Sequence, residues 1–400
     1  MKTRVAVFFG GRSPEHDVSI VTGLQAMEAL DQQVYESFPV YIAAGGEWWV
    51  GEHLRDRANY IPSEQMLKSL DAVTLDVGAN PDGVGRLISK RGGGLLGKRK
   101  AVEFDVALLA FHGLAGEDGR LQGLFDVANV PYTGMRTMAS AVFMDKAATK
   151  RLLAKSDIPL LPDVIIDRPV SGLIPAKESL EAAIAGLEFP FIVKPLHLGS
   201  SIGVARATNI EELRASLGAI FRLDTQAIVE PFVENLVEYN VAVSRFDGEA
   251  ATSAIERPKR VEELLDFRTK YMSEDGKSGS KTPGQSSQGM LSLTRDINPD
   301  IPAEMEANIR DWAVKCFQAA GGTGAPRIDF LSNAETGEVW LNEVNPCPGS
   351  LGFFLWEAAP KPLFFPDFLG KLIEEARAVH RSQQLPDDPT NPEARLFRRN

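Results

Sequence analysis

The sequence predicts an α/β protein of two or three domains, the first of which is an open α/β domain. Its 400 residues exceed the ~250–300 residues at which a single hydrophobic core stops growing. In the N-terminal region, short apolar runs alternate with helical patterns, which favours a sheet with helices packed on it. The composition, 44% hydrophobic and 24% charged, excludes a disordered, collagen-like or disulfide-scaffold chain.

The charge balance argues against a general nucleic-acid-binding protein, because 54 acidic residues outnumber 43 basic ones. No apolar run approaches the ~20 residues that a membrane-spanning helix needs, so we expect no membrane partner. The apolar run Val5–Phe9 is too short for a signal peptide, and two cysteines, Cys316 and Cys347, suit a reducing compartment. We therefore expect a cytoplasmic protein, in which a locally basic cleft could still bind an anion.

The N-terminal region predicts a strand, a glycine turn and then a helix. Ser13 as N-cap and Pro14 at the first helical position are typical of a helix start. A second strand is expected at Val106–Phe111. Open α/β sheets bind ligands at the carboxyl ends of their strands, so Glu15 and His112 are candidate binding residues.

The basic, glycine-rich stretch 78–100 contains an incomplete P-loop. Gly92, Gly97 and Lys98 have the P-loop spacing, but Arg99 stands where Ser or Thr should contact Mg²⁺. The residues that follow predict a strand, whereas a P-loop opens a helix. We therefore expect an exposed basic loop.

A lysine and a Gly-Ser loop, Pro195–Gly203, suggest a phosphate site. Lys194 ends a predicted strand in front of this loop, whose glycines and hydroxyls permit close contact with phosphate oxygens. Alone, the loop could be an ordinary turn, and Lys146, at the start of a predicted helix, would usually be solvated. Glu230 and Glu238, at and after a strand end, could bind an adenine amine and ribose hydroxyls, but such a pair would usually be surface charge.

A predicted hairpin is the most informative pattern. Residues two apart share a face of a strand, so Arg327 and Asp329 point one way, as do Glu343 and Asn345 on the returning strand. If the turn closes, two carboxylates and an amide oxygen converge, and these hard donors suit Mg²⁺. Arg327 could then neutralise a phosphate or an oxyanion. The spacing alone leaves a solvated hairpin face as the alternative.

Together these residues resemble the ATP-grasp fold and, within it, the D-alanine–D-alanine ligase family. The resemblance spans about Thr3 to Glu375 and rests on many short motifs in one order. They are Phe9-Gly10-Gly11-Arg12-Ser13-Pro14-Glu15-His16-Asp17-Val18-Ser19, His112-Gly113, Gly116-Glu117-Asp118-Gly119, Leu121-Gln122-Gly123, Pro131-Tyr132-Thr133-Gly134, Met144-Asp145-Lys146, Lys194-Pro195, Gly199-Ser200-Ser201-x-Gly203, Lys270-Tyr271, Arg327-x-Asp329 and Asn342-Glu343-Val344-Asn345-x-x-Pro348-Gly349.

The resemblance implies a three-domain ATP-grasp fold whose N-terminal domain is open α/β (Rossmann-like). We expect a substrate-binding domain at 1–140, a central ATP-grasp domain at 141–237, a C-terminal ATP-grasp domain at 238–382 and a tail at 383–400. The C-terminal domain would carry the metal site and a lid at about 267–289. Members are commonly dimeric through the N-terminal region, so a homodimer acting on small amino acids or amines is expected.

The resemblance also implies the chemistry, in which ATP converts a carboxylate into an acylphosphate and an amine then attacks it. ATP contacts are implied for Lys146, Lys194, Ser200, Ser201, Glu230, the backbone at Phe232 and Val233, Glu238 and Lys270. Two Mg²⁺ ions, with Mn²⁺ as a substitute, would be bound by Asp329, Glu343 and Asn345.

The remaining implied roles concern the substrates. Glu15 would accept from the ammonium of the first amino acid, with His112 nearby, and Ser200 and Tyr271 would link the loop and lid back to Glu15. The oxyanion of the tetrahedral intermediate would be stabilised by Arg327 and the Gly349 N–H.

One departure concerns the acceptor. By register, Phe354 replaces a family hydroxyl that helps to bind the acceptor carboxylate, and phenylalanine cannot donate to a carboxylate. Ser350 could substitute if the turn shifts. The interpretations are therefore a D-alanyl-D-alanine ligase, a specialised ligase with a larger or more apolar acceptor, a phosphotransferase that stops at the acylphosphate, and a non-catalytic nucleotide-binding protein.

Overall fold

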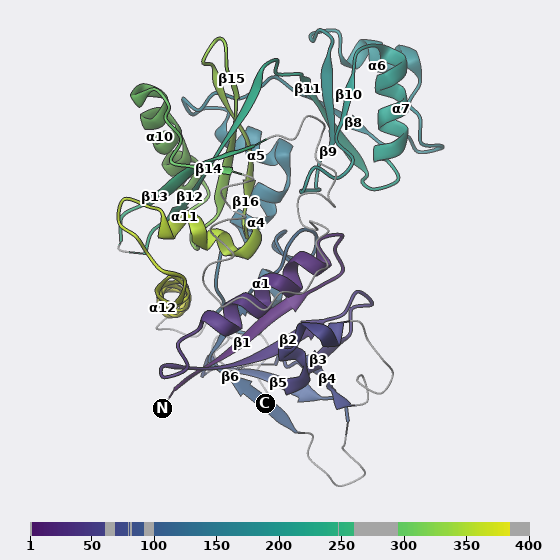
Figure 1. Ribbon diagram of the computed structural model, residues 1–400. Helices are drawn as coiled ribbons and strands as arrows, with labels where there is room; N and C mark the ends of the chain where they lie inside the picture. The colour runs from purple at the N-terminus through teal and green to yellow at the C-terminus, as the bar shows by residue number, and fades with distance from the viewer. Residues whose placement is uncertain are drawn as a thin grey trace, which may run out of the picture.

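The computed structural model describes residues 2–60, 69–78, 80, 82–91, 100–246, 248–259 and 295–384. Within these residues the strands form three β-sheets of seven, four and five strands. The seven-stranded sheet lies at one end of the molecule and the other two lie at the opposite end (Figure 1). Part of the basic stretch 78–100 is described, and it contains strand β5 Gly85–Ser89, with Leu87 buried, where an exposed loop was expected. The incomplete P-loop itself, the proposed lid with Lys270 and Tyr271, and nearly all of the tail fall outside the described residues.

The N-terminal sheet has the strand order β6-β5-β4-β3-β2-β1-β7. Strand β1, next to the edge strand β7, runs parallel to β2 and β7, while the remaining pairs are antiparallel. The strands are β1 Thr3–Gly10, β2 Tyr35–Ile42, β3 Trp48–Val50, β4 Asp71–Leu75, β5 Gly85–Ser89, β6 Ala101–Phe104 and β7 Val106–Leu109, with helices α1 His16–Ala29, η1 Glu52–Arg55, η2 Arg57–Tyr60 and α3 Arg120–Val127. The expected open α/β arrangement is confirmed around β1 and β7.

The predicted start of the first helix is wrong. Helix α1 begins at His16 rather than just after Ser13, and no side chain caps it. Ser13 instead accepts the Glu15 N–H on its hydroxyl at 3.1 Å, a local turn that competes with helix capping. The chain therefore makes one more turn before the helix, and Glu15 falls in that turn.

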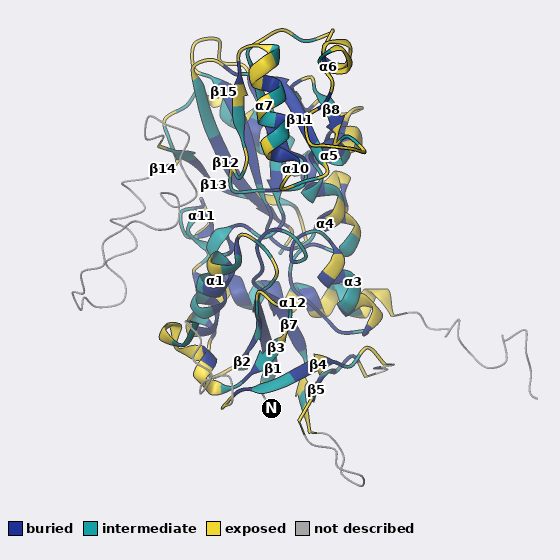
Figure 2. Ribbon diagram, turned by 90° about the vertical axis from the view of Figure 1, so that its right-hand side faces the viewer, coloured by how far each residue is buried: buried dark blue, intermediate teal, exposed yellow. Residues whose placement is uncertain are grey.

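The four-stranded sheet has the order β10-β9-β11-β8, all antiparallel. Its elements are β8 Val164–Asp167, α6 Lys177–Ala183, β9 Phe191–Pro195, β10 Ala205–Ala207, α7 Ile210–Ile220 and β11 Gln226–Pro231. Strand β10 begins only at Ala205, because Gly203 has a positive φ of 75° and keeps the preceding residues in a turn. In Figure 2 the strands are largely buried, whereas the outer face of α6 is exposed.

The five-stranded sheet has the order β14-β13-β12-β15-β16, again antiparallel. Its elements are β12 Leu236–Ser244, β13 Ala251–Pro258, β14 Arg295–Ile297, α10 Ala303–Ala319, β15 Arg327–Asn333 and β16 Val339–Asn345. Apolar residues from β12, β15, β16 and α10 form one buried core with α4 Thr137–Met144 and α5 Lys146–Leu153. The predicted hairpin therefore stands on a buried sheet.

The last helices return to the first sheet. After η3 Gly349–Gly352 and α11 Phe353–Glu357, helix α12 Phe365–Gln383 packs on α1 and β7. Phe368, Leu369, Leu372 and Ile373 of α12 share one core with residues of β1 and α1. None of the helices in the described ranges combines the length and apolar character that crossing a bilayer requires.

Candidate active site

Glu15 and His112 lie just beyond the carboxyl ends of two neighbouring parallel strands, β1 and β7. Glu15 is buried, and a Cβ atom on Gly113 would collide with its carboxylate. Gly113 also has a positive φ of 72°, a conformation that glycine adopts without steric cost. The sheet edge thus holds a buried carboxylate, with the chain after His112 close against it.

His112 is a fully buried, neutral histidine. Its Nδ1 lies 2.8 Å from the Cys347 carbonyl, so it carries the proton and donates. Its Nε2 lies 2.7 Å from the Thr22 hydroxyl and accepts from it. Burial lowers the pKa of His112 to about 4. The imidazole therefore acts as a fixed neutral group that ties the N-terminal sheet to the turn after β16, and sequence reasoning did not identify Thr22.

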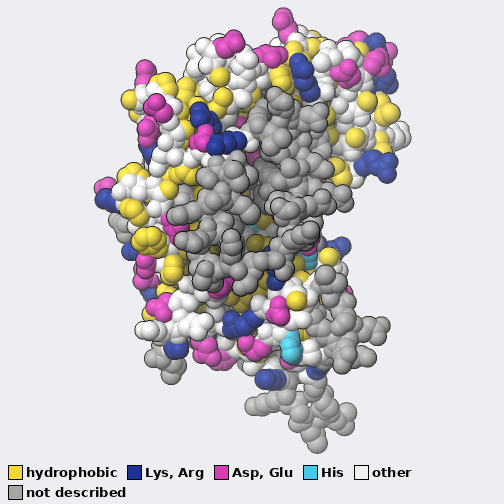
Figure 3. All heavy atoms as spheres, in the orientation of Figure 1, with side chains coloured by type: hydrophobic (Ala, Val, Ile, Leu, Met, Phe, Trp, Pro, Cys, Tyr) yellow, Lys and Arg dark blue, Asp and Glu magenta, His cyan; other side chains and the backbone are white. Residues whose placement is uncertain are grey.

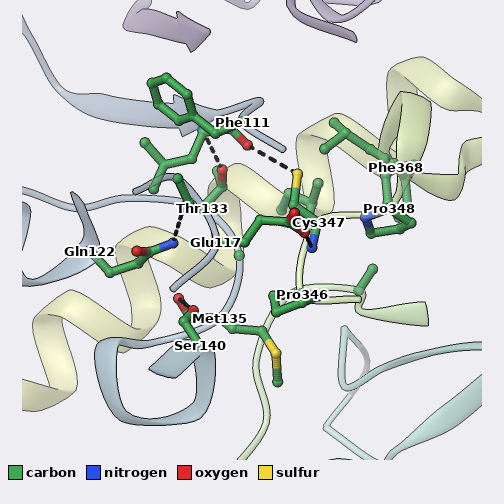
Figure 4. Close-up of a pocket in the computed structure, with 16 residues that line it drawn as sticks. Phe111, Glu117, Gln122, Thr133, Met135, Ser140, Pro346, Cys347, Pro348 and Phe368 are labelled. Carbon is green, nitrogen blue, oxygen red and sulfur yellow. Dashed lines mark hydrogen bonds between the residues drawn. The ribbon is translucent and has the colours of Figure 1, made fainter. Parts of the chain in front are cut away.

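Glu117 is a second carboxylate that sequence reasoning missed. It accepts the Gly113 N–H at 2.5 Å and the Cys347 N–H at 2.7 Å. Burial, together with the negative charge of Glu15, raises its pKa well above the usual range. Figure 4 shows Glu117 and Cys347 facing each other in a pocket beside this edge. The available signal was its place in a family motif, since nothing in the local spacing marks it.

Ser200 joins the Gly-Ser loop to the N-terminal edge, because its hydroxyl donates a short hydrogen bond to the Glu15 carboxylate. These residues lie 185 positions apart in the chain. The structure therefore brings together two of the three residues expected to form the link, while Tyr271 is outside the described residues.

Buried lysines gather around Glu230 at the end of β11. Lys194 lies 2.6 Å from one Glu230 oxygen and donates to Asn342 at 2.8 Å. Lys150 pairs with the other Glu230 oxygen and lies 3.3 Å from Asp163. Burial would raise the pKa of Glu230, but the charges of Lys194 and Lys150 outweigh it and lower that pKa to about 2.

Lys150 was not predicted, although it lies one helical turn after Lys146 on α5. Lys146 is buried, donates to the Leu198 carbonyl at 2.8 Å and lies 3.3 Å from Glu343. The two lysines share a helix face but contact different carboxylates. Lys146 therefore contacts the Gly-Ser loop and the hairpin, whereas Lys150 contacts the carboxylate at the end of β11.

The groups expected to hold a nucleoside lie beyond Glu230. The Phe232 N–H donates to the Pro190 carbonyl at 2.9 Å, so it is engaged within the protein. Its ring lies 4.4 Å below the guanidinium of Arg206. Val233 is buried, and Glu238 is half-buried on β12. An adenine base bound here would therefore have to form its hydrogen bonds with groups other than the Phe232 N–H.

The hairpin has the expected register, with Asp329 opposite Glu343 and Arg327 opposite Asn345. Arg327 donates to both Asp329 oxygens at 2.7 Å, and Asn345 donates to the same carboxylate at 2.8 Å. Asp329 is buried. The polar face of the hairpin is turned into the protein, and the alternative of a solvated face is wrong.

These donors fit a magnesium ion. Asp329, Glu343 and Asn345 offer carboxylate and amide oxygens, the ligands that Mg²⁺ prefers. Arg327 and Lys146 neutralise the two carboxylates in this arrangement, which is the electrostatic task that a divalent ion would share. The described residues contain no cluster of three or more His, Cys, Asp or Glu side chains suited to a metal. An ion here would therefore need the Asn345 oxygen and ligands from outside the protein.

The turn after β16 places Gly349 and Ser350 against α1. Ser350 has a positive φ of 52°, and its N–H donates to the Thr22 hydroxyl at 3.1 Å. Phe354, on α11, packs against the core shared with α12, and the Arg295 guanidinium lies 4.6 Å over its ring. Phe354, Gly349 and Ser350 do not line the cavity in which Glu15, Lys146, Glu343 and Asn345 meet.

That cavity unites groups from the sheets described above. It is lined by Glu15, Glu117, Phe143, Met144, Lys146, Leu198, Gly199, Glu343, Val344, Asn345 and Pro346. Acidic and basic side chains are interspersed over the described part of the face in Figure 3, whereas Lys146, Lys150 and Lys194 are buried. The positive charge that could bind a polyanion is thus concentrated inside a protein with a net charge of −11.

Comparison with known proteins agrees with this geometry. The chain matches the family models described as D-ala D-ala ligase N-terminus, over residues 4–135, and D-ala D-ala ligase C-terminus, over residues 152–374. It is 33% identical to a D-alanine–D-alanine ligase of Heliobacterium modesticaldum, covering 96% of this chain and 97% of that protein. A second relative, from Staphylococcus saprophyticus, bears the same name and is 32% identical over 96% of this chain and 98% of that protein.

Two solved structures share the fold over nearly the whole length. A D-alanine-D-alanine ligase from Coxiella burnetii superposes with a TM-score of 0.75 at 24% identity, covering 96% of both chains. The VanG D-Ala:D-Ser ligase of Enterococcus faecalis gives a TM-score of 0.71 at 26% identity, covering 94% of this chain and 100% of that one.

Proposed function

The chain belongs to the D-alanine–D-alanine ligase family, and from this premise we propose that it joins two molecules of D-alanine. Membership makes it an ATP-grasp enzyme and an ATP-dependent ligase that forms an amide bond. The observation that supports the assignment is the cavity in which Glu15, Lys146, Glu343 and Asn345 meet. A donor-binding carboxylate, a phosphate-binding lysine and metal-binding oxygens are there within reach of one substrate.

The first amino acid is held at the edge of the N-terminal sheet. Glu15 accepts from its ammonium group, and the hydroxyl of Ser200 fixes the orientation of that carboxylate. His112 stays neutral and holds the Cys347 carbonyl in place. The donor carboxylate is thereby directed toward the lysines and the hairpin.

ATP lies between the four-stranded and five-stranded sheets. Lys146, Lys194 and the hydroxyls and N–H groups of Ser200 and Ser201 contact its phosphates, with Lys270 closing from the lid. Glu230 stays ionised because two lysines flank it, so it accepts from the adenine amine, beside the backbone at Phe232 and Val233. Glu238 accepts from the ribose hydroxyls.

Asp329, Glu343 and Asn345 would hold two Mg²⁺ ions, which Mn²⁺ could replace. Such ions would supply positive charge that stabilises the transferring phosphoryl group. Arg327, already beside Asp329, orients that carboxylate and reaches the reacting carboxyl group.

The chain's own residues then carry the two steps. A donor carboxylate oxygen bonds to the γ-phosphorus as the bond to ADP breaks, which gives an acylphosphate. The acceptor nitrogen attacks the carbonyl carbon, loses a proton, and phosphate leaves as the carbon–oxygen bond breaks. Arg327 and the Gly349 N–H stabilise the oxyanion between attack and departure, and the lid with Tyr271 excludes the water that would hydrolyse the acylphosphate.

D-alanine is proposed as acceptor as well as donor. The relatives named above are D-alanine–D-alanine ligases, and one solved neighbour is a D-Ala:D-Ser ligase. Phe354 packs in the core instead of lining the cavity, so it gives no support to a larger apolar acceptor. Ser350, in the turn after β16, then supplies the hydroxyl for the acceptor carboxylate. We further propose a cytoplasmic homodimer with domain boundaries near residues 140 and 237.

A coupled assay of ADP release with pairs of substrates tests the proposal. D-alanine alone should support turnover as donor and acceptor, and L-alanine should not. D-serine and D-amino acids with large apolar side chains serve as competing acceptors, and Glu343→Ala provides the inactive control. Best turnover with a large acceptor would overturn the D-alanine assignment. ADP release without any amine would indicate a phosphotransferase, and nucleotide binding without turnover a non-catalytic protein.

A further inference from the structure

His197 lies inside the Gly-Ser loop and contacts carboxylates from two other elements. Its backbone N–H donates to Asp224 Oδ2 at 2.8 Å, and its ring Nδ1 lies 2.9 Å from Asp224 Oδ1. Its Nε2 lies 3.6 Å from Asp145 Oδ2. Asp224 belongs to the turn before β11, and Asp145 is the N-cap of α5, where it accepts the Ala148 N–H. The imidazole therefore bridges two elements of the nucleotide site.

The geometry requires a charged imidazole. A neutral ring has one N–H, so one of its nitrogens would present a lone pair to a carboxylate. The imidazolium donates from Nδ1 to Asp224 and faces Asp145 with a protonated Nε2 at ion-pair distance, so both carboxylates meet positive charge. The interactions with Asp145 and then Asp224 raise the pKa of His197 to about 9. Within the described residues, these two carboxylates are the charged groups that act on the ring.

The loop needs such an anchor because its tip is conformationally unfavourable. Ser200 and Ser201 have positive φ values of 52° and 58°, a region that non-glycine residues rarely occupy. One side of the tip is fixed to the N-terminal sheet through Glu15. On the other side, Lys146 donates to the Leu198 carbonyl at 2.8 Å, next to His197. The two anchors thus serve different substrates, the donor on one side and ATP on the other.

We propose that His197 is a positioning residue whose imidazolium, held between Asp145 and Asp224, fixes the Gly-Ser loop against α5 in the conformation that binds ATP phosphates. This inference rests on the proposed role of the loop in binding ATP. It goes beyond that role because it assigns the order of the loop to one charge held between two carboxylates of the protein. Loss of the charge weakens ATP binding and leaves donor binding intact.

The charge gives the effect a direction in pH. A histidine whose folded pKa is raised contributes fully below its unfolded pKa of 6.5 and loses that contribution as pH rises through about 9. KM for ATP in the wild-type enzyme should therefore rise from about pH 8 to about pH 10. His197→Asn, which can still donate to Asp224 but carries no charge, should show an elevated KM throughout and lack this rise.

The test compares steady-state constants and ATP affinity, measured by calorimetry, for wild type and four variants. His197→Asn should raise KM for ATP about tenfold while kcat and the donor KM stay within about threefold. His197→Arg restores a cation with two donors and should recover most of the affinity. Asp145→Asn keeps the helix cap and removes the opposing charge, so it should reproduce the His197→Asn effect. The control is His53→Asn, an exposed histidine of η1.

The outcomes separate this inference from the proposed function. A KM for ATP in His197→Asn within twofold of wild type, with an unchanged pH profile, overturns the role of His197 and leaves the ligase assignment untouched. Failure of the wild-type protein to bind ATP overturns the proposed function itself. If circular dichroism shows that His197→Asn is unfolded, Asp145→Asn carries the same two outcomes. An equal fall in affinity with His197→Arg and His197→Asn would also overturn the proposal, because it would show that ring shape matters and charge does not.

Discussion

Replacing Lys150 by methionine should lower the free energy of unfolding by about 3 kcal/mol. Methionine keeps the unbranched stem in the core but removes the ammonium that pairs with Glu230 and donates to the Leu161 carbonyl at 2.8 Å. Glu230 is almost fully buried. It would keep only Lys194 of its two lysine partners.

Two arguments give this magnitude. Removing one partner of a buried ion pair costs ~3–5 kcal/mol, and the lower end applies because Lys194 remains. The pKa of Glu230 falls from 4.5 to about 2, which corresponds to about 3 kcal/mol in favour of the ionised form. That is the balance left after two lysines have overcome burial, and Lys194, whose charge acts more strongly than that of Lys150, remains in the variant. Because this pKa is lowered, the contribution is present above pH 4.5 and is lost as pH falls toward 2.

Chemical unfolding followed by tryptophan fluorescence at neutral pH measures the effect. Lys155→Met, on an exposed lysine just after the same helix, is the matched control and should change the free energy by less than about 0.5 kcal/mol. Lys150→Met/Glu230→Gln should lose less stability than the sum of the two single variants, because the two deleted groups are partners in one buried ion pair. Equal midpoints for Lys150→Met and Lys155→Met would refute the reasoning, as would a double variant less stable than the sum of its parts.

Three further predictions concern the candidate active site. Glu343→Ala should cut ADP release at least about 100-fold in the coupled assay by removing a metal-binding oxygen; unchanged turnover would refute the metal assignment. Ser200→Ala should lower kcat/KM for the donor by about 10–100-fold, the worth of a hydrogen bond to a carboxylate, and a normal donor constant would contradict the role given to Glu15. The pKa of His112 is lowered from 6.5 to about 4, so stability should fall by up to about 3 kcal/mol as pH drops through that window. His112→Gln should remove this acid sensitivity in unfolding experiments, and a variant with the same pH dependence as wild type would contradict it.

Much of the site could be predicted because its chemistry is encoded locally. The alternation of Arg327 with Asp329, and of Glu343 with Asn345, fixes which side chains share a strand face, and the observed register follows from it. Likewise, the apolar runs that became β1 and β7 end at polar residues, which placed Glu15 at a ligand-binding edge.

The missed residues depend on partners that are distant in the chain. Lys150 looks like any helical lysine until Glu230, 80 positions away, is brought beside it. Glu117 can be recognised as a site residue only when the Cys347 N–H, 230 positions away, is seen to donate to it. The local spacing of residues in the sequence does not predict contacts between such distant positions. The misplaced start of α1 has a different cause, because Ser13 can cap a helix or close a turn and the choice depends on burial of Glu15.

Helix α12 has a consequence for the order in which the protein can assemble. The inner face of the first sheet and of α1 is covered by Phe368, Leu369 and Leu372, which are among the last apolar residues of the described chain. During synthesis, the earliest strands therefore leave the ribosome long before the surface that completes their core. The four-stranded sheet, by contrast, draws its core from a single continuous stretch, residues 166–229, and has what it needs to fold first. The domain made first is thus the last one whose interior can be sealed from water.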